Sequence, residues 1–285
     1  MTDLDTKTPT QRFSQRPLGS TGLHVSALGL GTVKLGRNQG VKYPTGFELP
    51  SDAEALTLIN RARALGINLI DTAPAYGTSE QRLGPLLAGQ RDNWIICSKV
   101  GEEFDAGKSH YDFSAPHTRL SIERSLTRLG TDYLDLVLVH SDGNDVDIIE
   151  NTEVFSALEQ CKRDGKIHAF GMSTKTVAGG ILAARESDCV MVTYNPAHTA
   201  EQPVLDECRR LNRGVLLKKA LASGHLCHTG EQSNPVRHSL EFAFAHPGVS
   251  AAIIGTINPA HLDDNVQQAR AALAALAQAQ SGEQP

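Results

Sequence analysis

The sequence predicts an α/β protein, a single (β/α)8 barrel with an N-terminal β-hairpin closing its bottom. Three observations favour this fold. Eight short apolar runs recur along the chain, amphipathic helical patterns lie between them, and 285 residues with 40% hydrophobic content can bury one large core. Alternation of strand and helix implies a parallel sheet, and eight such units in about 250 residues fit a closed barrel better than an open doubly wound sheet.

The apolar runs are the predicted strands. They are VSALGL (25–30), INLI (67–70), WIICS (94–98), LDLVLV (134–139), IHAFGM (167–172), VMVTY (190–194), GVLLK (214–218) and SAAII (250–254). Helices are expected between them. In the helix after residue 51, Ser51 is the expected N-cap and Glu54 closes a capping box. Other helical patterns cover 116–129, 152–163, 201–211 and 259–276.

Three segments do not belong to this repeat. RPLGSTGLHV (16–25) has Gly19 and Gly22 around Ser20-Thr21, which is typical of a tight hairpin. The loop 32–50 is too long for a simple connection, which favours a functional loop such as a lid. Residues 1–14 and 280–285 are expected to be flexible ends of one domain spanning 1–285, and the polar stretch AQAQSGEQP (277–285) is expected to fray.

Composition limits the class of partner. The chain has 27 Lys and Arg against 32 Asp and Glu, a net charge of -5, and no basic block. This excludes an obvious nucleic-acid or anionic-membrane surface, so we expect small-molecule partners. Five cysteines are scattered without a Cys-x-x-Cys pair, the N-terminus has no apolar signal core, and no stretch approaches the roughly 20 apolar residues of a membrane span. We expect a reduced cytoplasmic protein.

Ionisable side chains follow three neighbouring predicted strands. Asp71 ends the second run, Lys99 the third and His140 the fourth, and Tyr76 lies five residues after Asp71 on the same loop. In barrels of this kind the reactive groups lie at the C-terminal ends of strands. Each residue alone has an ordinary structural explanation, such as capping a helix or simple exposure, but together they predict one site.

The chemistry of this set follows from its pKa values. A phenol has a pKa near 10, and a neighbouring ammonium lowers it by favouring the phenolate. We therefore expect Lys99 to lower the pKa of Tyr76, Asp71 to hold Lys99 protonated, and His140 to orient a substrate oxygen or relay the proton. Such a set suits protonation of a carbonyl oxygen while hydride, supplied by a cofactor, attacks the carbon.

The sequence resembles the aldo-keto reductases along nearly its whole length. The similarity lies in LGSTGLHVSALGLGT (18–32), DTAPAYGTSE (71–80), ICSKVG (96–101), SIERSLTRLGTDYLDLVLVH (121–140), GKIHAFGMS (165–173) and IIGTINPAHLDDNV (253–266). The resemblance implies a barrel that binds NADPH, less often NADH, in extended form. It implies Tyr76 as general acid and base, with Asp71, Lys99 and His140 as its partners.

The resemblance also implies cofactor contacts, with departures at the nicotinamide. Gly31 and Thr32 match the loop along the cofactor, and Ser173 matches the serine that holds the carboxamide. The family often has Asn at Thr174, Gln at Met191 and a stacking aromatic residue at Lys218, so neither Met191 nor Lys218 supplies the usual interaction. Asp71 is a further implied cofactor contact. Leu221, Gly224 and Leu226 match the loop that covers the pyrophosphate, and Asp264 and Asn265 match residues that bind the adenine. Gly255, Thr256 and His261 complete the implied contacts.

The choice between NADPH and NADH depends on the residues near the ribose 2'-phosphate. The family often has Lys at Gly255 and Arg at His261, so both full charges for a ribose 2'-phosphate are missing. Thr256, Asn258 and backbone amides near Pro259 can still donate hydrogen bonds. We expect a modest preference for NADPH, with NADH also used.

Weaker signals complete the sequence reading. Tyr43, Phe47, Phe104 and Tyr111 lie in strand-following loops and are candidates to line a substrate pocket. Gly29-Leu30-Gly31 lacks the rest of a dinucleotide fingerprint and is better explained as a packing turn. His225-Leu226-Cys227-His228 lacks an evident third ligand, so no metal is expected.

Three functions remain open from the sequence. The first is NAD(P)H-dependent reduction of an aldehyde or ketone. The second is a nicotinamide-binding regulatory subunit with little turnover, because the same family includes channel subunits. The third is a lyase or isomerase that uses the same Tyr and Lys without a cofactor.

Overall fold

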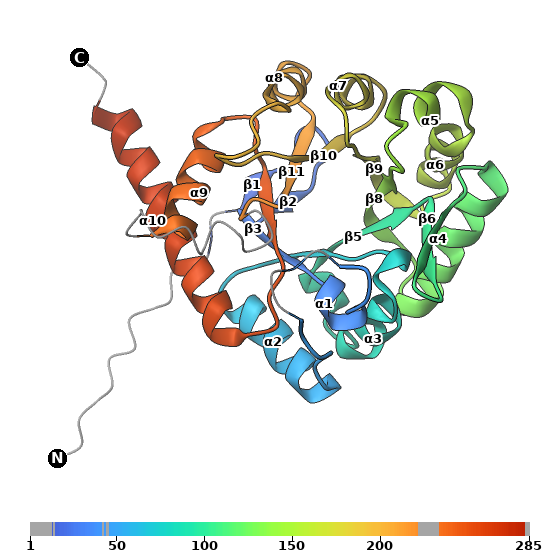
Figure 1. The fold of residues 1–285 in the computed structure, drawn as a ribbon, viewed down its shortest axis with the longest axis horizontal. Coiled ribbons are helices and arrows are strands. Elements are labelled where there is room, and N and C mark those ends of the chain that lie inside the picture. Colours follow the sequence, from blue (N-terminus) through green and yellow to red (C-terminus); the bar gives the residue numbers. More distant parts are fainter. Residues whose placement is uncertain (1–12, 14, 42, 44–45, 222–233, 283–285) are drawn as a thin grey trace.

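Eight parallel strands form a closed barrel with helices around it (Figure 1). The computed structural model describes residues 13, 15–41, 43, 46–221 and 234–282. The strand order around the barrel is β10-β11-β12-β3-β4-β5-β8-β9. The strands are β3 (Leu28–Gly31), β4 (Leu69–Asp71), β5 (Ile95–Val100), β8 (Leu134–His140), β9 (Ile167–Ser173), β10 (Cys189–Thr193), β11 (Gly214–Lys218) and β12 (Ala251–Ile254). All eight predicted runs therefore form barrel strands, and the predicted fold class is confirmed.

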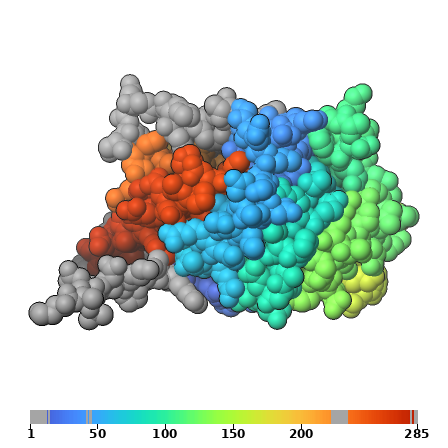
Figure 2. All heavy atoms as spheres, turned by 90° about the horizontal axis from the view of Figure 1, so that it is seen from below, coloured from blue at the N-terminus to red at the C-terminus, as the bar shows by residue number. Residues whose placement is uncertain are grey.

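The barrel helices follow their strands along the chain. They are α2 (Asp52–Ala64), α3 (Ser79–Leu86), α4 (Ala115–Leu129), α6 (Val154–Arg163), α7 (Val177–Glu186), α8 (Gln202–Arg210), α9 (Pro235–Ala245) and α10 (Pro259–Gly282). The predicted capping box of α2 is present: Ser51 Oγ accepts from the backbone of Glu54, whose carboxylate accepts from the backbone of Ser51. Figure 2 shows α10 in red beside α2 in light blue, where Arg61 Nε lies 2.6 Å from Asp263 Oδ1.

The C-terminal helix is longer than the sequence pattern indicated. We expected helix to residue 276 and fraying after it, but α10 continues through Gly282. Ala and Gln are strong helix formers, so the AQAQ stretch extends the helix although it buries little apolar surface. Among the described helices, α10 included, no segment is long and apolar enough to cross a membrane.

The predicted N-terminal hairpin is present and seals the barrel at the N-terminal ends of its strands. Strands β1 (Arg16–Pro17) and β2 (His24–Val25) pair antiparallel. Leu18, between them, is fully buried against the barrel interior, and the backbone of Ser20 donates to Asn212 just before β11. Gly19 has φ +55°, and a Cβ there would lie 2.4 Å from the backbone nitrogen of Gly214, so only glycine fits this contact.

Short elements surround the opposite end of the barrel. They are α1 (Val33–Gly36), η1 (Pro74–Tyr76), α5 (Asp145–Asn151), and an antiparallel hairpin of β6 (Glu102–Asp105) and β7 (Lys108–Tyr111). The short helix η2 (Arg91–Asn93) precedes β5 and therefore lies at the N-terminal end of the strands. From the sequence, Phe104 and Tyr111 were expected in a loop. The structure has a hairpin there, and β7 is exposed throughout, so it has no apolar alternation that would indicate a strand. The predicted lid 32–50 contains α1, and its role stays a prediction.

The core has two layers because side chains of a strand alternate between its two faces. In β8, Val137 and Val139 pack outward against the helices, whereas Leu136 and Leu138 fill the barrel interior. The same alternation decides which residues face the open end of the barrel.

Candidate active site

The candidate site continues the inner rows of the barrel by one step. Side chains two positions apart share a face of a strand. Leu69, Cys97 and Leu138 lie in the inner cluster, and Asp71, Lys99 and His140 follow each of them by two positions. The three predicted ionisable residues therefore lie at the C-terminal end of the barrel interior, on the neighbouring strands β4, β5 and β8.

Asp71 and Lys99 form a buried ion pair. Lys99 Nζ lies 2.6 Å from Asp71 Oδ1 and donates to the backbone oxygen of Thr72 at 2.9 Å, and the two side chains are 1% and 5% exposed. Burial works to lower the pKa of Lys99, but the carboxylate of Asp71, with Tyr76 and Cys97, raises it above its ordinary value. Lys99 therefore carries its charge at neutral pH, as the sequence indicated.

Tyr76 reaches this pair from the short helix η1. Its hydroxyl donates to Asp71 Oδ2 at 3.3 Å, and Lys99 Nζ lies 4.7 Å from the centre of its ring. The loop is held closely: a Cβ on Gly36 would lie 2.1 Å from the backbone nitrogen of Ser79.

The pKa of Tyr76 differs from the sequence-based expectation. Burial raises it first, the Asp71 carboxylate raises it further, and Lys99 acts in the opposite direction. The net shift is upward, whereas we expected the ammonium to lower the pKa. The reason is that the same burial that brings Lys99 close also removes water from the phenolate. Tyr76 therefore keeps its proton at neutral pH in this structure.

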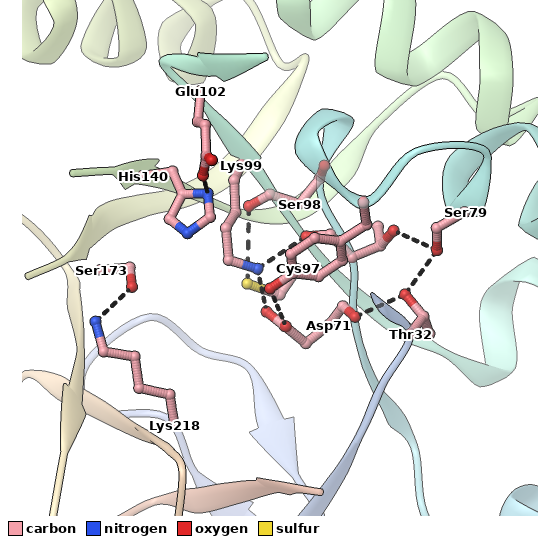
Figure 3. Close-up of polar contacts among 12 residues, drawn as sticks. Thr32, Asp71, Ser79, Cys97, Ser98, Lys99, Glu102, His140, Ser173 and Lys218 are labelled. Carbon is pink, nitrogen blue, oxygen red and sulfur yellow. Dashed lines mark hydrogen bonds and ion pairs between the residues drawn. The ribbon is translucent and has the colours of Figure 1, made fainter. Parts of the chain in front are cut away.

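His140 completes the predicted four. Its ring is perpendicular to that of Tyr76, with the centroids 6.4 Å apart. No partner for its ring was predicted from the sequence, but Glu102 at the start of β6 places Oε2 2.6 Å from its Nδ1 (Figure 3). Burial lowers the pKa of His140, Glu102 opposes this shift, and the cations of Lys99 and Lys218 add to it, so the net shift is downward.

The other side of the barrel mouth carries Ser173, Thr174 and Lys218. Lys218 ends β11, and its Nζ donates to Ser173 Oγ at 3.0 Å and to the backbone oxygen of Thr174 at 2.5 Å (Figure 3). Burial lowers the pKa of Lys218 to about 8, although the carboxylates of Glu201 and Asp145 oppose this.

The remaining residues near the strand ends have structural tasks. Thr32 is fully buried, and its hydroxyl donates to the backbone oxygen of Asp71 at 2.9 Å, so it supports the site from behind. Met191 is part of the inner cluster, and its backbone oxygen accepts from Thr174. Gly31 lies at the end of β3, in register with Asp71. Leu221 packs at the edge of the outer core, whereas Gly224, Leu226 and the HLCH stretch lie outside the described residues.

The proposed adenine end lies at the start of α10. The side chain of Asn258 accepts from the backbone of Ala260 at 2.9 Å and of His261 at 3.4 Å, and Thr256 Oγ1 accepts from the backbone of Asn258. The amides that we expected to favour a phosphate are therefore capped by the chain itself. His261, Gly255 and Asp264 are exposed, whereas Thr256 and Asn265 are buried.

The four candidate substrate aromatics form two separate groups. Tyr43 and Phe47 meet edge to face with centroids 5.6 Å apart, and Lys34 Nζ lies 4.1 Å from the centre of the Tyr43 ring. Phe104 lies on β6 under the guanidinium of Arg37, at 3.4 Å, and Tyr111 on β7 is 39% exposed. Phe104 and Tyr111 thus belong to a hairpin beside the mouth instead of a loop.

The residues at the mouth fit a nicotinamide carboxamide. Thr174 Oγ1 is buried without a hydrogen-bond partner in the described part of the chain, and Ser173 Oγ lies on the preceding residue. A carboxamide has both a donor and an acceptor and would satisfy the Thr174 hydroxyl, whose burial is otherwise costly.

Comparison with known proteins agrees with this geometry. A model of the Aldo/keto reductase family matches residues 27–239. This range includes all four candidate catalytic residues and every barrel strand but β12. The chain belongs to the aldo/keto reductase family. It is accordingly an oxidoreductase that interconverts carbonyl compounds and alcohols with a nicotinamide cofactor.

Several relatives can be compared with this aldo/keto reductase. It is 58% identical to a putative aldo-keto reductase from Pseudomonas aeruginosa, with a TM-score of 0.83, covering 91% of this chain and 95% of that one. It is 26% identical to YqkF, an uncharacterized oxidoreductase of Bacillus subtilis, over 90% of this chain and 91% of that protein. It is 30% identical to a D-threo-aldose 1-dehydrogenase from a Pseudomonas species, over 76% of this chain and 71% of that protein.

One site residue of this aldo/keto reductase, Glu102, and one contact of a predicted residue, that of Lys218 with Ser173, were not predicted from the sequence. Glu102 was missed because an acidic residue next to Glu103 after a strand has no distinguishing pattern. The bond of Lys218 to Ser173 was missed because pairing across β9, β10 and β11 depends on barrel register. The alternation of inner residues was a usable signal for Lys218, since it follows Leu216 by two positions.

Proposed function

We propose that this aldo/keto reductase reduces an aldehyde or ketone with NADPH, and also with NADH, and that Tyr76 donates the proton to the carbonyl oxygen. The observation that carries the proposal is the buried cluster of Tyr76, Asp71 and Lys99 at the barrel mouth. When bound, the cofactor supplies the hydride to the carbonyl carbon. Tyr76 keeps its proton at neutral pH, which suits an acid, and the ammonium of Lys99 stabilises the phenolate that remains after transfer.

The remaining residues have positioning roles in this proposal. Asp71 holds Lys99 and keeps it charged, and Ser173 and Thr174 orient the nicotinamide carboxamide. The regulatory-subunit hypothesis has no specific support, because the cluster of acid, ammonium and carboxylate is intact. The lyase hypothesis would use the same cluster, and the family match favours a nicotinamide-dependent oxidoreductase instead.

The preference for NADPH rests on the resemblance, because Asn258 already caps the backbone amides at the start of α10. In the stretch 255–266 only His261 can carry a positive charge, so we propose a modest preference. The four described cysteines are all buried and free, which supports the proposal that the protein works with reduced thiols in the cytoplasm.

An aldose is one substrate class to be tested. Two relatives are named for the oxidation of sugars: the D-threo-aldose 1-dehydrogenase of Pseudomonas and the D-arabinose 1-dehydrogenase of Saccharomyces cerevisiae. The second is 38% identical over 67% of this chain and 58% of that protein. We therefore propose that sugars be included with simple aldehydes and ketones in the panel.

The test is Tyr76→Phe, with Tyr133→Phe as the matched control. Tyr133 precedes β8 at the other end of the barrel, where it stacks on His168. NADPH fluorescence gives the dissociation constant, and absorbance gives its oxidation in the presence of the substrate panel. We expect Tyr76→Phe to lose about 10²- to 10⁴-fold in kcat while NADPH affinity changes at most a few-fold, and the control to keep both.

Two outcomes contradict the proposal. If Tyr76→Phe keeps more than about a tenth of kcat with chemistry limiting the rate, Tyr76 is not the acid. If the wild-type protein binds NADPH but oxidises it with no member of the panel, the regulatory subunit is favoured, and absence of binding favours the lyase.

A further inference from the structure

Glu102 is fixed beside His140 by the hairpin that follows β5. It is the first residue of β6, and its side chain is 9% exposed. Oε1 accepts from Ser109 Oγ on β7 at 2.5 Å, and Oε2 lies 2.6 Å from His140 Nδ1. Both carboxylate oxygens are therefore held, one by the hairpin and one by the histidine.

The charges of the two partners differ. Burial works to raise the pKa of Glu102, but its contacts with His140 and Ser109 and the charge of Arg37 lower it to about 2. The pKa of His140 is lowered, by burial first and then by Lys99 and Lys218, against the opposing effect of Glu102. At neutral pH the structure thus contains an ionised carboxylate beside a neutral imidazole.

The short contact decides where the single imidazole proton lies. If Nδ1 carried no proton, its lone pair would face a carboxylate lone pair at 2.6 Å, which is repulsive. The contact falls short of hydrogen-bond geometry at the nitrogen, and Nδ1 has no hydrogen-bond partner among the described residues, so Glu102 Oε2 is the acceptor within its reach. A proton on Nδ1 removes the repulsion and leaves Nε2 with a free lone pair. Figure 3 shows the second ring nitrogen on the side away from Glu102, facing toward Lys99 and Ser173.

We propose that Glu102 is a positioning residue that holds His140 as its Nδ1–H tautomer, so that Nε2 faces the barrel mouth as a hydrogen-bond acceptor for a substrate hydroxyl. The proposal rests on the proposed function, because it assumes that the reacting oxygen lies between Tyr76 and His140. It assigns to Glu102 the role that a buried carboxylate has behind a histidine in a catalytic triad, which is to fix the tautomer.

The consequence is a preference between the two members of the substrate couple. An alcohol accepts a hydrogen bond from Tyr76 and donates its own to Nε2, so it satisfies both groups. A carbonyl oxygen can only accept, so it leaves the Nε2 lone pair without a partner. Near neutral pH the site therefore binds the hydroxyl form better than the carbonyl form, by the worth of about one hydrogen bond, or roughly tenfold.

The direct test is the tautomer of His140 in protein with ¹⁵N-labelled histidine. The ¹⁵N shifts of the two ring nitrogens distinguish a protonated from a bare nitrogen, and comparison with His140→Gln assigns the signals. At pH 7.5 and without cofactor, we expect Nδ1 protonated and Nε2 bare in the wild type. In Glu102→Leu we expect the proton to move largely to Nε2, which an unconstrained neutral imidazole favours.

Glu103→Gln is the matched control, because Glu103 is the next residue of β6 and contacts Arg124 and His117. It should leave the signals of His140 unchanged. In the turnover assay, Glu102→Leu should raise the KM of the alcohol relative to that of the carbonyl by about tenfold, whereas a purely structural role would change both equally.

Each result supports or overturns the proposal. A protonated Nε2 and bare Nδ1 in the wild type, or an unchanged tautomer in Glu102→Leu, overturns it. The wild-type spectrum alone decides the tautomer if the leucine variant does not fold. If the expected tautomer is found but no substrate couple turns over, the proposed function fails while the assignment of Glu102 to His140 stands.

Discussion

The buried pair of Lys99 and Asp71 should be among the most sensitive electrostatic contacts of the molecule. Lys99→Met removes the ammonium and leaves the carboxylate of Asp71 buried and unpaired, which typically costs about 3–5 kcal/mol. The variant also loses the hydrogen bond from Nζ to Thr72, worth about 1 kcal/mol. We therefore expect a loss of about 4–6 kcal/mol in the free energy of unfolding.

A double-mutant cycle measures the interaction energy of Lys99 with Asp71 apart from the other effects of each substitution. Combining Lys99→Met with Asp71→Leu removes both charges, so the double variant should recover most of the stability. The measurement is urea unfolding followed by circular dichroism at pH 7. The pKa of Lys99 is raised in the folded state, so its contribution is complete below its unfolded value and is lost only as pH rises through the folded value. The interaction free energy from the cycle should accordingly be the same between pH 6 and 9.

The surface pair of Lys162 and Asp188 is the control. Its atoms are 2.7 Å apart, similar to the buried pair, but its side chains are 34% and 16% exposed. Lys162→Met should cost no more than about 1 kcal/mol. If Lys99→Met costs no more than Lys162→Met, the pair at the barrel mouth is hydrated and the reasoning from burial is wrong.

Two further predictions concern the cofactor side of the mouth. The pKa of Lys218 is lowered to about 8 by burial, so between pH 8 and about 10.5 the unfolded chain binds more protons and rising pH stabilises the wild type. Lys218→Met should be the more stable protein at pH 7, and its advantage in urea unfolding should shrink toward pH 10.5; an advantage independent of pH would show that Lys218 titrates normally. If His261 contacts the ribose 2'-phosphate, His261→Gln should weaken binding of NADPH and leave binding of NADH unchanged, as measured by the two dissociation constants. An unchanged ratio of these constants in His261→Gln excludes His261 as the phosphate contact, and a wild-type preference for NADH excludes NADPH as the main cofactor.

The elements predicted from the sequence are those that a local pattern determines. Eight apolar runs and their intervening helices were found because burial imposes periods of about two and 3.6 residues. The hairpin of β6 and β7 has no such pattern: all four residues of β7 are exposed, so its pairing depends on the chain around it. The end of α10 was placed too early because its last turns rest on helix propensity alone.

The candidate site was predictable as a list of residues but not as an electrostatic unit. Strand ends located Asp71, Lys99 and His140, since position in a barrel follows from position in a strand. Lys99 acts on the Tyr76 pKa in the expected direction, but burial and Asp71 outweigh it and the net shift is upward. The amount of water that is excluded decides this balance, and no sequence pattern predicts it. Glu102 was missed for a related reason: its contact with His140 requires the hairpin, and the hairpin was not predicted.

The barrel can close only after its last strand has been synthesised, because β12 pairs with β3. β3 pairs with both β4 and β12, so one edge of the first barrel strand stays open until the last strand is made. At about 5–20 residues per second, the ribosome completes β12 roughly 10 to 45 seconds after β3. During this interval the backbone groups of Leu28 to Gly31 have no partner on one side, and an exposed strand edge invites pairing with other chains. The pairing of residues 251–254 with β3 is therefore the step that removes this exposed edge.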